Sequence, residues 1–264
     1  MNDITMQRKN EEFTNYANVQ LRMERFIKEK VKDKNVVVGL SGGIDSSLAC
    51  VLAKNALGAK KVHGLVLTNS KFAQEVGIKQ VKDFAKKHGI IFSEIDISKV
   101  RSIIMSTLDE DVHKPTVDVR LCDLYLRLYA KQNDCIYLGT INATERLTGW
   151  FPKGALIGDY DLLGDLFKMQ IKELATHMGL THLVPTVAQE ATHICSGCGE
   201  LPEFSGISYD DLDKMLLIYR AHPANFKQEC KKAGFKQKDY VRILRRMSSV
   251  SHKYDAFPLY PRIN

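Results

Sequence analysis

A strand, a glycine-rich loop and a helix follow one another near the start of this chain. The apolar run 35–38 leads into Gly-Leu-Ser-Gly-Gly-Ile-Asp-Ser at residues 39–46, and a helix-like stretch follows from Ser46 to Asn55. Glycines let the backbone approach a phosphate closely, and the amides at the start of the next helix point at that phosphate. The unit therefore predicts a phosphate-binding site in an α/β fold; the alternative is a glycine-rich turn without a ligand.

The side chains of this loop indicate what it would bind. Ser41 and Ser46 add hydroxyl donors, whereas Asp45 adds a negative charge. A carboxylate beside a polyphosphate normally requires a cation between the two. The loop is not a Walker A motif, because no Gly-Lys-Ser/Thr ends it.

Strands alternate with helices along most of the chain, which predicts a doubly wound parallel sheet flanked by helices. We expect strands at 35–40, 61–67, 90–95 and 135–139, and helices at 10–33, 46–55, 74–88, 99–108, 119–132, 165–178, 209–221, 224–233 and 237–250.

Polar residues follow three of these strands, at 41–46, 68–70 and 140–145. Ligands of such sheets bind at the carboxyl ends of the strands, near the point where the strand order reverses. We therefore expect these three segments to converge on one crevice.

Length and composition narrow the class of protein. The 264 residues contain no linker-like block or repeat, so we expect one domain over 1–264. The lack of a long apolar stretch and of a signal peptide predicts a cytoplasmic protein that does not bind membranes. The net charge of +7 is scattered, which suits anionic small molecules and gives no reason to expect nucleic acid as a partner.

The loop at 39–46 resembles the Ser-Gly-Gly-x-Asp-Ser pyrophosphate loop of the N-type ATP pyrophosphatases. With the later motifs, the chain from about residue 10 to 262 resembles the ammonia-dependent, single-domain branch of the NAD synthetase family. This resemblance implies a Rossmann-like fold of the adenine nucleotide α-hydrolase type. It also implies ATP as a substrate, Mg²⁺ as a cofactor and a homodimer.

The resemblance extends to a set of ATP-site residues. Residues 139–145 match the family's Gly-Thr-Gly-Asn-Lys-Ser-Glu, which implies that Thr140 contacts ATP and that Glu145 shares a magnesium ion with Asp45. Lys168 matches a lysine that binds ATP phosphate, and with Asp45 and Glu145 it completes the implied catalytic set. The alternatives are a solvated helix-start carboxylate for Glu145 and a surface lysine for Lys168. The implied ATP-binding residues are Gly39, Leu40, Ser41, Gly42, Gly43, Ile44, Asp45, Ser46, Thr140 and Lys168.

The half of the family pattern that binds the second substrate is altered. The family's Lys-Tyr-Gly-Asp-Gly loop is here 151–155, with Ala155 where an aspartate is expected. In the family the His-Lys pair near the C-terminus reaches the substrate of the partner subunit. The substrate-binding residues that the resemblance implies are Arg120, Lys153, His252 and Lys253.

A Cys-x-x-Cys pair with a nearby histidine lies in the segment 185–206, which we expect to form a mobile lid because it is polar and lacks periodicity. Three interpretations of His193, Cys195 and Cys198 stay open: reduced thiols without a role, metal ligands, or thiols with sulfur or redox chemistry.

The sequence thus predicts an ATP- and Mg²⁺-dependent carboxylate–ammonia ligase that adenylates deamido-NAD and amidates it with ammonia. Ala155 and the cysteine pair motivate an alternative, a related enzyme that amidates or thiolates a different carboxylate, sugar or nucleotide. A nucleotide-binding protein without turnover is the third hypothesis, but it would be expected to lose Asp45 or Glu145 first.

Overall fold

The computed structural model describes residues 15–68, 75–109, 114–181, 204 and 206–256. Helices and strands alternate in these ranges as far as β5, and every element described after β5 is a helix. In chain order they are α2 (Tyr16–Val31), β1 (Asn35–Gly39), α3 (Ile44–Leu57), η1 (Ala59–Lys61), β2 (Val62–Thr68), α4 (Glu75–His88), β3 (Ile91–Asp96), α5 (Ser98–Ser106), α6 (Lys114–Gln132), β4 (Cys135–Gly139), α7 (Ala143–Thr148), β5 (Tyr160–Asp161), α8 (Lys168–His177), α9 (Tyr209–Ala221), α10 (Phe226–Lys232), α11 (Gln237–Ser249) and η4 (Ser251–Ala256).

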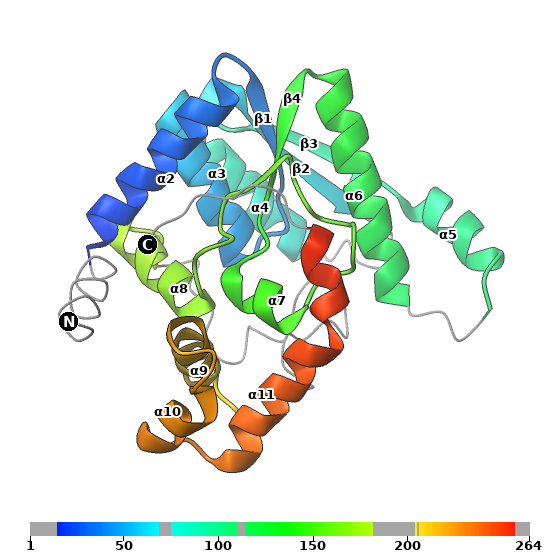
Figure 1. Ribbon diagram of the computed structural model, residues 1–264. Helices are drawn as coiled ribbons and strands as arrows, with labels where there is room; N and C mark the ends of the chain where they lie inside the picture. The colour runs from blue at the N-terminus through cyan, green and yellow to red at the C-terminus, as the bar shows by residue number, and fades with distance from the viewer. Residues whose placement is uncertain (1–14, 69–74, 110–113, 182–203, 205, 257–264) are drawn as a thin grey trace.

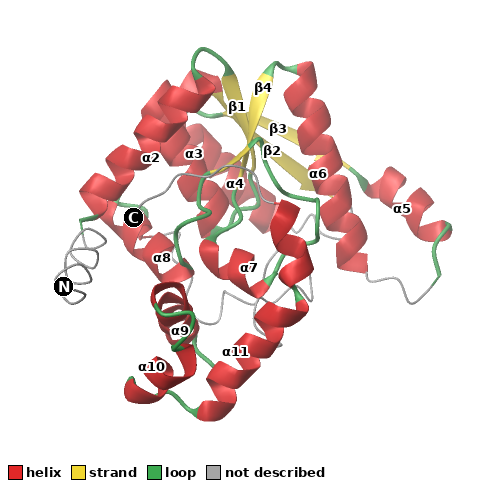
Figure 2. Ribbon diagram, viewed as in Figure 1, coloured by secondary structure: helices red, strands yellow, loops and turns green. Residues whose placement is uncertain are grey.

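The strands form one parallel sheet in the order β3-β2-β1-β4-β5 (Figures 1 and 2). β1 is central: Val37 is the Cα partner of His63 in β2 on one side and of Tyr137 in β4 on the other. The strand order reverses at this point, so the connections after β1 and β4 run to opposite sides of the sheet at its carboxyl edge, which is where ligands of such sheets bind. The predicted doubly wound parallel sheet is confirmed.

The two faces of β1 pack into different hydrophobic clusters, as alternation along a strand requires. Val36 and Val38 lie in the larger cluster with buried residues of α2, α3 and α8. Val37 lies in the other cluster, together with Leu126 of α6. The near-continuous apolar sequence of β1 follows from this burial on both faces.

A separate hydrophobic cluster joins α7 and α8 to the three C-terminal helices α9, α10 and α11. In Figure 2 this helical region lies beyond the carboxyl edge of the sheet, beneath the strands in that view. Phe167, Phe204 and Phe226 are almost fully buried in it. The helices after α8 therefore support α7 and the start of α8 at the carboxyl edge of the sheet.

No helix within the described ranges is both long enough and apolar enough to cross a membrane.

The four expected strands are all present, with boundaries within a residue or so, but the sequence analysis missed α7 and β5. α7 has six residues and β5 has two, which is too short for periodicity to reveal. The helix expected from residue 165 begins instead at Lys168, because Phe167, at the N-cap position, is still extended. Asp165 is not helical and pairs with Arg220 of α9.

Two glycines let β5 approach β4. A Cβ on Gly139 would lie 1.8 Å from Asp161 Oδ1, and a Cβ on Gly158 would lie 2.2 Å from the Gly139 nitrogen. Asp161 is fully buried, and its Oδ1 accepts a 3.1 Å hydrogen bond from the Gly158 N–H. Burial raises the pKa of the Asp161 carboxyl from 3.8 to about 7, against the opposing charges of Arg127 and Arg146.

We predict that Asp161→Asn stabilises the protein, and increasingly so as the pH rises. Between pH 4 and 7 the folded state keeps a proton on Asp161 that the unfolded chain releases, so stability falls as the pH rises and levels off above 7. The variant removes this loss, with a gain on the order of 2–4 kcal/mol at pH 8 and little gain at pH 4. The free energy of unfolding in urea, measured from pH 4 to 8 for the variant and the natural protein, gives this gain, and Asp33→Asn at an exposed position is the control. A gain that does not vary with pH would contradict the prediction.

Candidate active site

The serines of the glycine-rich loop fasten the loop to the first turn of α3. The Ser41 N–H donates to Ser46 Oγ at 3.3 Å, the Ser46 hydroxyl donates to the Gly43 carbonyl at 3.1 Å, and Ser41 Oγ accepts from the Gly43 N–H at 3.3 Å. Gly42 lies between them in a left-handed conformation with φ +83°, where a Cβ would also approach Val81 to 3.0 Å. The serines and Gly42 thus fix the shape of the loop.

The N-terminus of α3 opens onto this loop. Its N-cap residue is Gly43, which supplies no side-chain hydrogen bond to the first amides of the helix. Amides in such a position favour an anionic ligand, and the partial positive charge of the helix end acts in the same direction.

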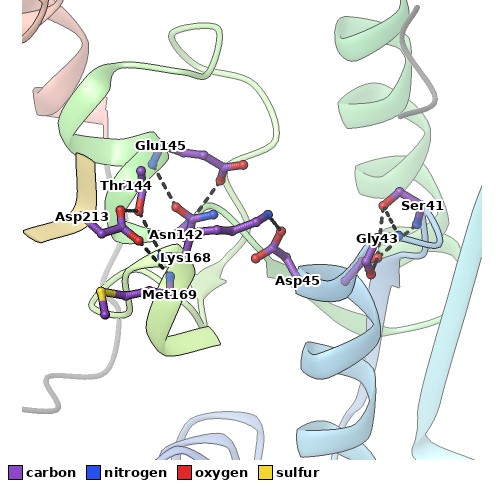
Figure 3. Close-up of polar contacts among 10 residues, drawn as sticks. Ser41, Gly43, Asp45, Asn142, Thr144, Glu145, Lys168, Met169 and Asp213 are labelled. Atoms are coloured by element: carbon purple, nitrogen blue, oxygen red, sulfur yellow. Dashed lines mark hydrogen bonds and ion pairs between the residues drawn. The ribbon is translucent and has the colours of Figure 1, made fainter. Parts of the chain in front are cut away.

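A buried ion pair joins α8 to α3. Lys168 Nζ, from the first residue of α8, lies 2.5 Å from Oδ2 of Asp45 in the first turn of α3 (Figure 3). The lysine side chain is 4% exposed and the aspartate side chain 17% exposed. Among the residues that the structure describes, the other oxygen of Asp45, Oδ1, is buried without a hydrogen-bond partner. An oxygen in this state is suited to a ligand that carries positive charge.

Glu145 forms a capping box at the start of α7. Its Oε2 accepts from the Asn142 N–H at 3.0 Å, and Asn142 Oδ1 accepts from the Glu145 N–H at 2.9 Å. Figure 3 shows the Glu145 side chain leaving α7 on the side where Lys168 and Asp45 meet. Glu145 is therefore partly buried and fixed in its direction, unlike a freely solvated helix-start carboxylate.

A second buried carboxylate lies behind these groups. Asp213 of α9 is fully buried and accepts from the Thr144 hydroxyl at 2.6 Å and from the Met169 N–H at 2.8 Å (Figure 3). Thr144 Oγ1 in turn accepts from the Lys168 N–H at 3.0 Å. Burial raises the pKa of Asp213 to about 6, while these hydrogen bonds and the nearby charges of Lys168 and Lys172 act to lower it.

The carboxylates fit a magnesium ion that arrives with a phosphate ligand. Mg²⁺ prefers oxygen donors and commonly takes one or two carboxylates together with substrate phosphates and water. Asp45 offers a buried oxygen that lacks a protein partner in the described part of the chain. Within those same ranges no three His, Cys, Asp or Glu side chains gather as a self-contained metal site, so substrate oxygens would have to complete the coordination.

The four residues expected to bind the second substrate meet around the loop 149–155. Lys153 Nζ donates to the His252 carbonyl at 2.6 Å, and Lys253 Nζ donates to the carbonyls of Gly149 and Phe151 at 2.8 and 2.9 Å. Arg120 Nη1 lies 3.9 Å from the position that a Cβ on Gly154 would take. The Lys253 ammonium ties the C-terminal η4 to the loop of its own chain.

Ala155 is fully buried, so this loop does not present residue 155 to a ligand as the family pattern suggested. Asp123 fixes the next turn: its Oδ1 accepts from the Leu156 N–H at 2.8 Å and its Oδ2 accepts from Arg127 Nε at 2.9 Å. Leu156 has φ +59°, an uncommon conformation for a non-glycine residue, which this hydrogen bond helps to hold.

Several of these groups were missed by the sequence analysis. The Asn-x-x-Glu spacing of 142–145 is a capping-box signature that could have been found. Asp213 carries no such local signal, because its partners Thr144 and Met169 lie 69 and 44 residues away along the chain, and the bond from Asp123 to Leu156 spans 33 residues. His193, Cys195 and Cys198, with nearly all of the expected lid at 185–206, lie outside the described residues, and Thr140 is half-buried directly after β4.

A family model and two related proteins all carry the description NAD synthase or NAD synthetase. A family model described as NAD synthase matches residues 19–256. The NH3-dependent NAD(+) synthetase of Pyrococcus furiosus is 32% identical over 208 residues, covering 76% of this chain and 78% of that protein. The protein of the same description from Hyperthermus butylicus is 29% identical over 248 residues, covering 90% and 88%.

Solved structures share the fold. The NH3-dependent NAD synthetase from Campylobacter jejuni, in complex with the nitrate ion, superposes with a TM-score of 0.74 at 20% identity, covering 90% of this chain and 96% of that one. The NMN synthetase from Francisella tularensis superposes with a TM-score of 0.66 at 23% identity, covering 92% and 95%. The Rossmann-like fold expected from the sequence is thereby confirmed.

We predict that Ala155→Asp destabilises the protein. The change would bury a carboxylate at a fully buried position close to the Asp123 anchor, at a cost of about 3 kcal/mol or more. Urea unfolding at pH 7.5 measures the loss. Ala17→Asp, at an exposed position in the first turn of α2, is the control and should change stability little. Equal stability of both variants would show that residue 155 faces solvent.

Proposed function

The chain belongs to the NAD synthase family, and from this premise we propose how its residues carry out the reaction of an ATP-dependent ligase that amidates deamido-NAD with ammonia. The reaction has two steps. A carboxylate oxygen of the nicotinate attacks the α-phosphorus of ATP. A bond forms between that oxygen and Pα, the bond from Pα to the oxygen that bridges to Pβ breaks, and pyrophosphate leaves. Neutral ammonia then attacks the acyl carbon, AMP leaves, and one proton is released as the amide forms.

The Asp45–Lys168 ion pair is the observation that carries our assignment of the ATP site. It places a cation and a carboxylate, both largely buried, at the meeting point of the loop after β1 and the helix that follows β5. A triphosphate at this point would meet the uncapped amides of α3, and Lys168 would exchange the Asp45 carboxylate for phosphate oxygen.

Asp45 and Glu145 are the residues that would hold the magnesium ion. When bound, the ion neutralises the charge of the phosphates and of the pyrophosphate that leaves. The protein's own contribution is positioning and electrostatic stabilisation. Loop amides and Lys168 fix the phosphates for in-line attack, and little acid–base chemistry by side chains is needed.

The cationic group around the loop 149–155 is the site that we propose for the dinucleotide. Arg120, Lys153 and His252 are exposed there, so they are available to its phosphates. Lys253 has a different role in this chain, because its ammonium is held by two backbone carbonyls. It shapes the loop to which the substrate binds.

We also propose a homodimer, as the resemblance implies. α6 exposes Leu124 and Leu128, one helical turn apart and 50% and 54% exposed, on a face that a second copy could cover. Light scattering should then give the mass of two 29.9 kDa chains. A single domain over 1–264 and a cytoplasmic location remain predictions from the sequence.

We predict that the purified protein forms NAD and pyrophosphate in equal amounts from deamido-NAD, ATP, Mg²⁺ and ammonium. Asp45→Asn should lower the rate about a hundredfold or more, because it removes the carboxylate with the unsatisfied oxygen. Coupled pyrophosphate release and chromatography of NAD measure this, with Asp33→Asn as the matched surface control.

Two outcomes would contradict the proposal. A folded Asp45→Asn protein with normal Mg²⁺-dependent turnover would remove Asp45 from the metal site. Pyrophosphate release with another carboxylate, and none with deamido-NAD, would replace the acceptor while leaving the ATP chemistry in place.

A further inference from the structure

The first residue of α8 carries the lysine of the ATP site, and the only capping bond from within α8 that the structure describes is that of Gln170 Oε1, which accepts from the Phe167 N–H at 2.9 Å. The N-cap residue of α8 is Phe167, whose side chain makes no capping hydrogen bond. The first amides of a helix need partners when they are buried. Here the partners come from two other helices: Thr144 Oγ1 of α7 accepts from the Lys168 N–H, and Asp213 Oδ2 of α9 accepts from the Met169 N–H.

The two capping groups are themselves linked. The Thr144 hydroxyl donates to Asp213 Oδ1 at 2.6 Å, so one carboxylate binds both the start of α8 and the first turn of α7 (Figure 3). Each of those turns bears one group of the ATP site: Lys168 begins α8, and Glu145 directly follows Thr144. Asp213 and Thr144 are 0% and 4% exposed, so water does not offer replacement hydrogen bonds.

We propose that Asp213 is a positioning residue for the ATP site, which sets the relative placement of Lys168 and Glu145 by holding the starts of α7 and α8 on one carboxylate. This inference rests on the proposed function, because it gives Lys168 and Glu145 their roles toward MgATP. Asp213 acts through its hydrogen bonds to Thr144 and Met169, and the charge of Lys168 also acts on its carboxylate.

The network uses both oxygens of a carboxylate. Both oxygens of Asp213 accept a hydrogen bond, one from an N–H and one from a hydroxyl. An asparagine has a single oxygen, so its NH₂ group could engage Thr144 only by reversing the direction of that hydrogen bond. A negative group also suits the partial positive charge at the start of α8. Burial raises the pKa of Asp213 to about 6, which leaves the carboxylate ionised at neutral pH and above.

α9 does not depend on Asp213 alone for its place. Two turns further along, Arg220 donates to the Asp165 carbonyl and carboxylate at 3.2 and 3.0 Å, and its guanidinium lies 4.5 Å from the centre of the Phe167 ring. α9 also contributes Leu212 and Leu216 to the helical core cluster. Loss of the Asp213 carboxylate should therefore alter the starts of α7 and α8 locally, without releasing α9.

The test compares Asp213→Asn with Asp210→Asn, which lies on the exposed face of the same helix. The first readout is the affinity for Mg²⁺ and α,β-methylene-ATP, measured by calorimetry at pH 7.5. We expect Asp213→Asn to weaken it about tenfold to a hundredfold, as removal of an outer residue of a metal site does, and Asp210→Asn to leave it unchanged. The second readout is steady-state kinetics, where the KM for deamido-NAD should not change while kcat falls.

A second pair of variants keeps the inference testable if Asp213→Asn does not fold. Thr144→Val removes the linking hydroxyl in a side chain of the same shape, whereas Thr144→Ser keeps the hydroxyl. The serine variant should retain an affinity for the analogue closer to that of the natural protein. Because Thr144 and Asp213 act as one unit, the double variant should lose no more affinity for the analogue than the single variant that binds it less tightly.

Unchanged affinity in Asp213→Asn would overturn the inference, as would equal effects of Thr144→Val and Thr144→Ser. A natural protein that binds the analogue but makes no NAD would instead overturn the proposed function. In that case the binding comparison would still decide the role of Asp213.

Discussion

The ion pair between Asp45 and Lys168 connects the two halves of this structure. Asp45 belongs to the β1–loop–α3 unit, and Lys168 belongs to α8, which follows β5 on the other side of the strand reversal. Buried charges are costly unless they are paired. Each of these two charges therefore lowers the free-energy cost of burying the other.

This dependence gives a physical reason for a ready ATP site. A site built for a triphosphate and a cation must hold positive and negative groups together before the ligand arrives. Pairing them with each other satisfies both charges at rest. In the proposed function, phosphate would replace Asp45 as the partner of Lys168, and Mg²⁺ would replace Lys168 as the partner of Asp45, so neither charge would be left without an opposite charge.

Much of this arrangement could be predicted from the sequence. The apolar run before residue 39 and the glycine-rich loop depend on local sequence pattern, so the parallel sheet and the strand–loop–helix unit could be anticipated. Lys168 stood out only through resemblance to a family, because a lysine at a helix start looks the same whether it is buried or solvated.

What could not be predicted depends on contacts between distant segments. Asp213 meets Thr144 across 69 residues, and only the folding of α9 against α7 and α8 brings the two together. Ala155 shows the opposite case. Its alignment with an aspartate of the family pattern suggested a residue that faces a ligand, but the side chain is buried. The Asp123 anchor and the conformation of Leu156 turn the loop so that residue 155 is buried instead.

A double-mutant cycle on the ion pair tests the central claim most directly. The free energy of unfolding in urea, without ligand, is measured for the natural protein, Asp45→Asn, Lys168→Met and the double variant. Each single change should cost about 2–4 kcal/mol, because it removes one charge from a largely buried ion pair. The double variant should cost less than the sum, with a coupling free energy of about 1–3 kcal/mol. Additive effects of the two changes would show that the pair does not join the two halves of the site.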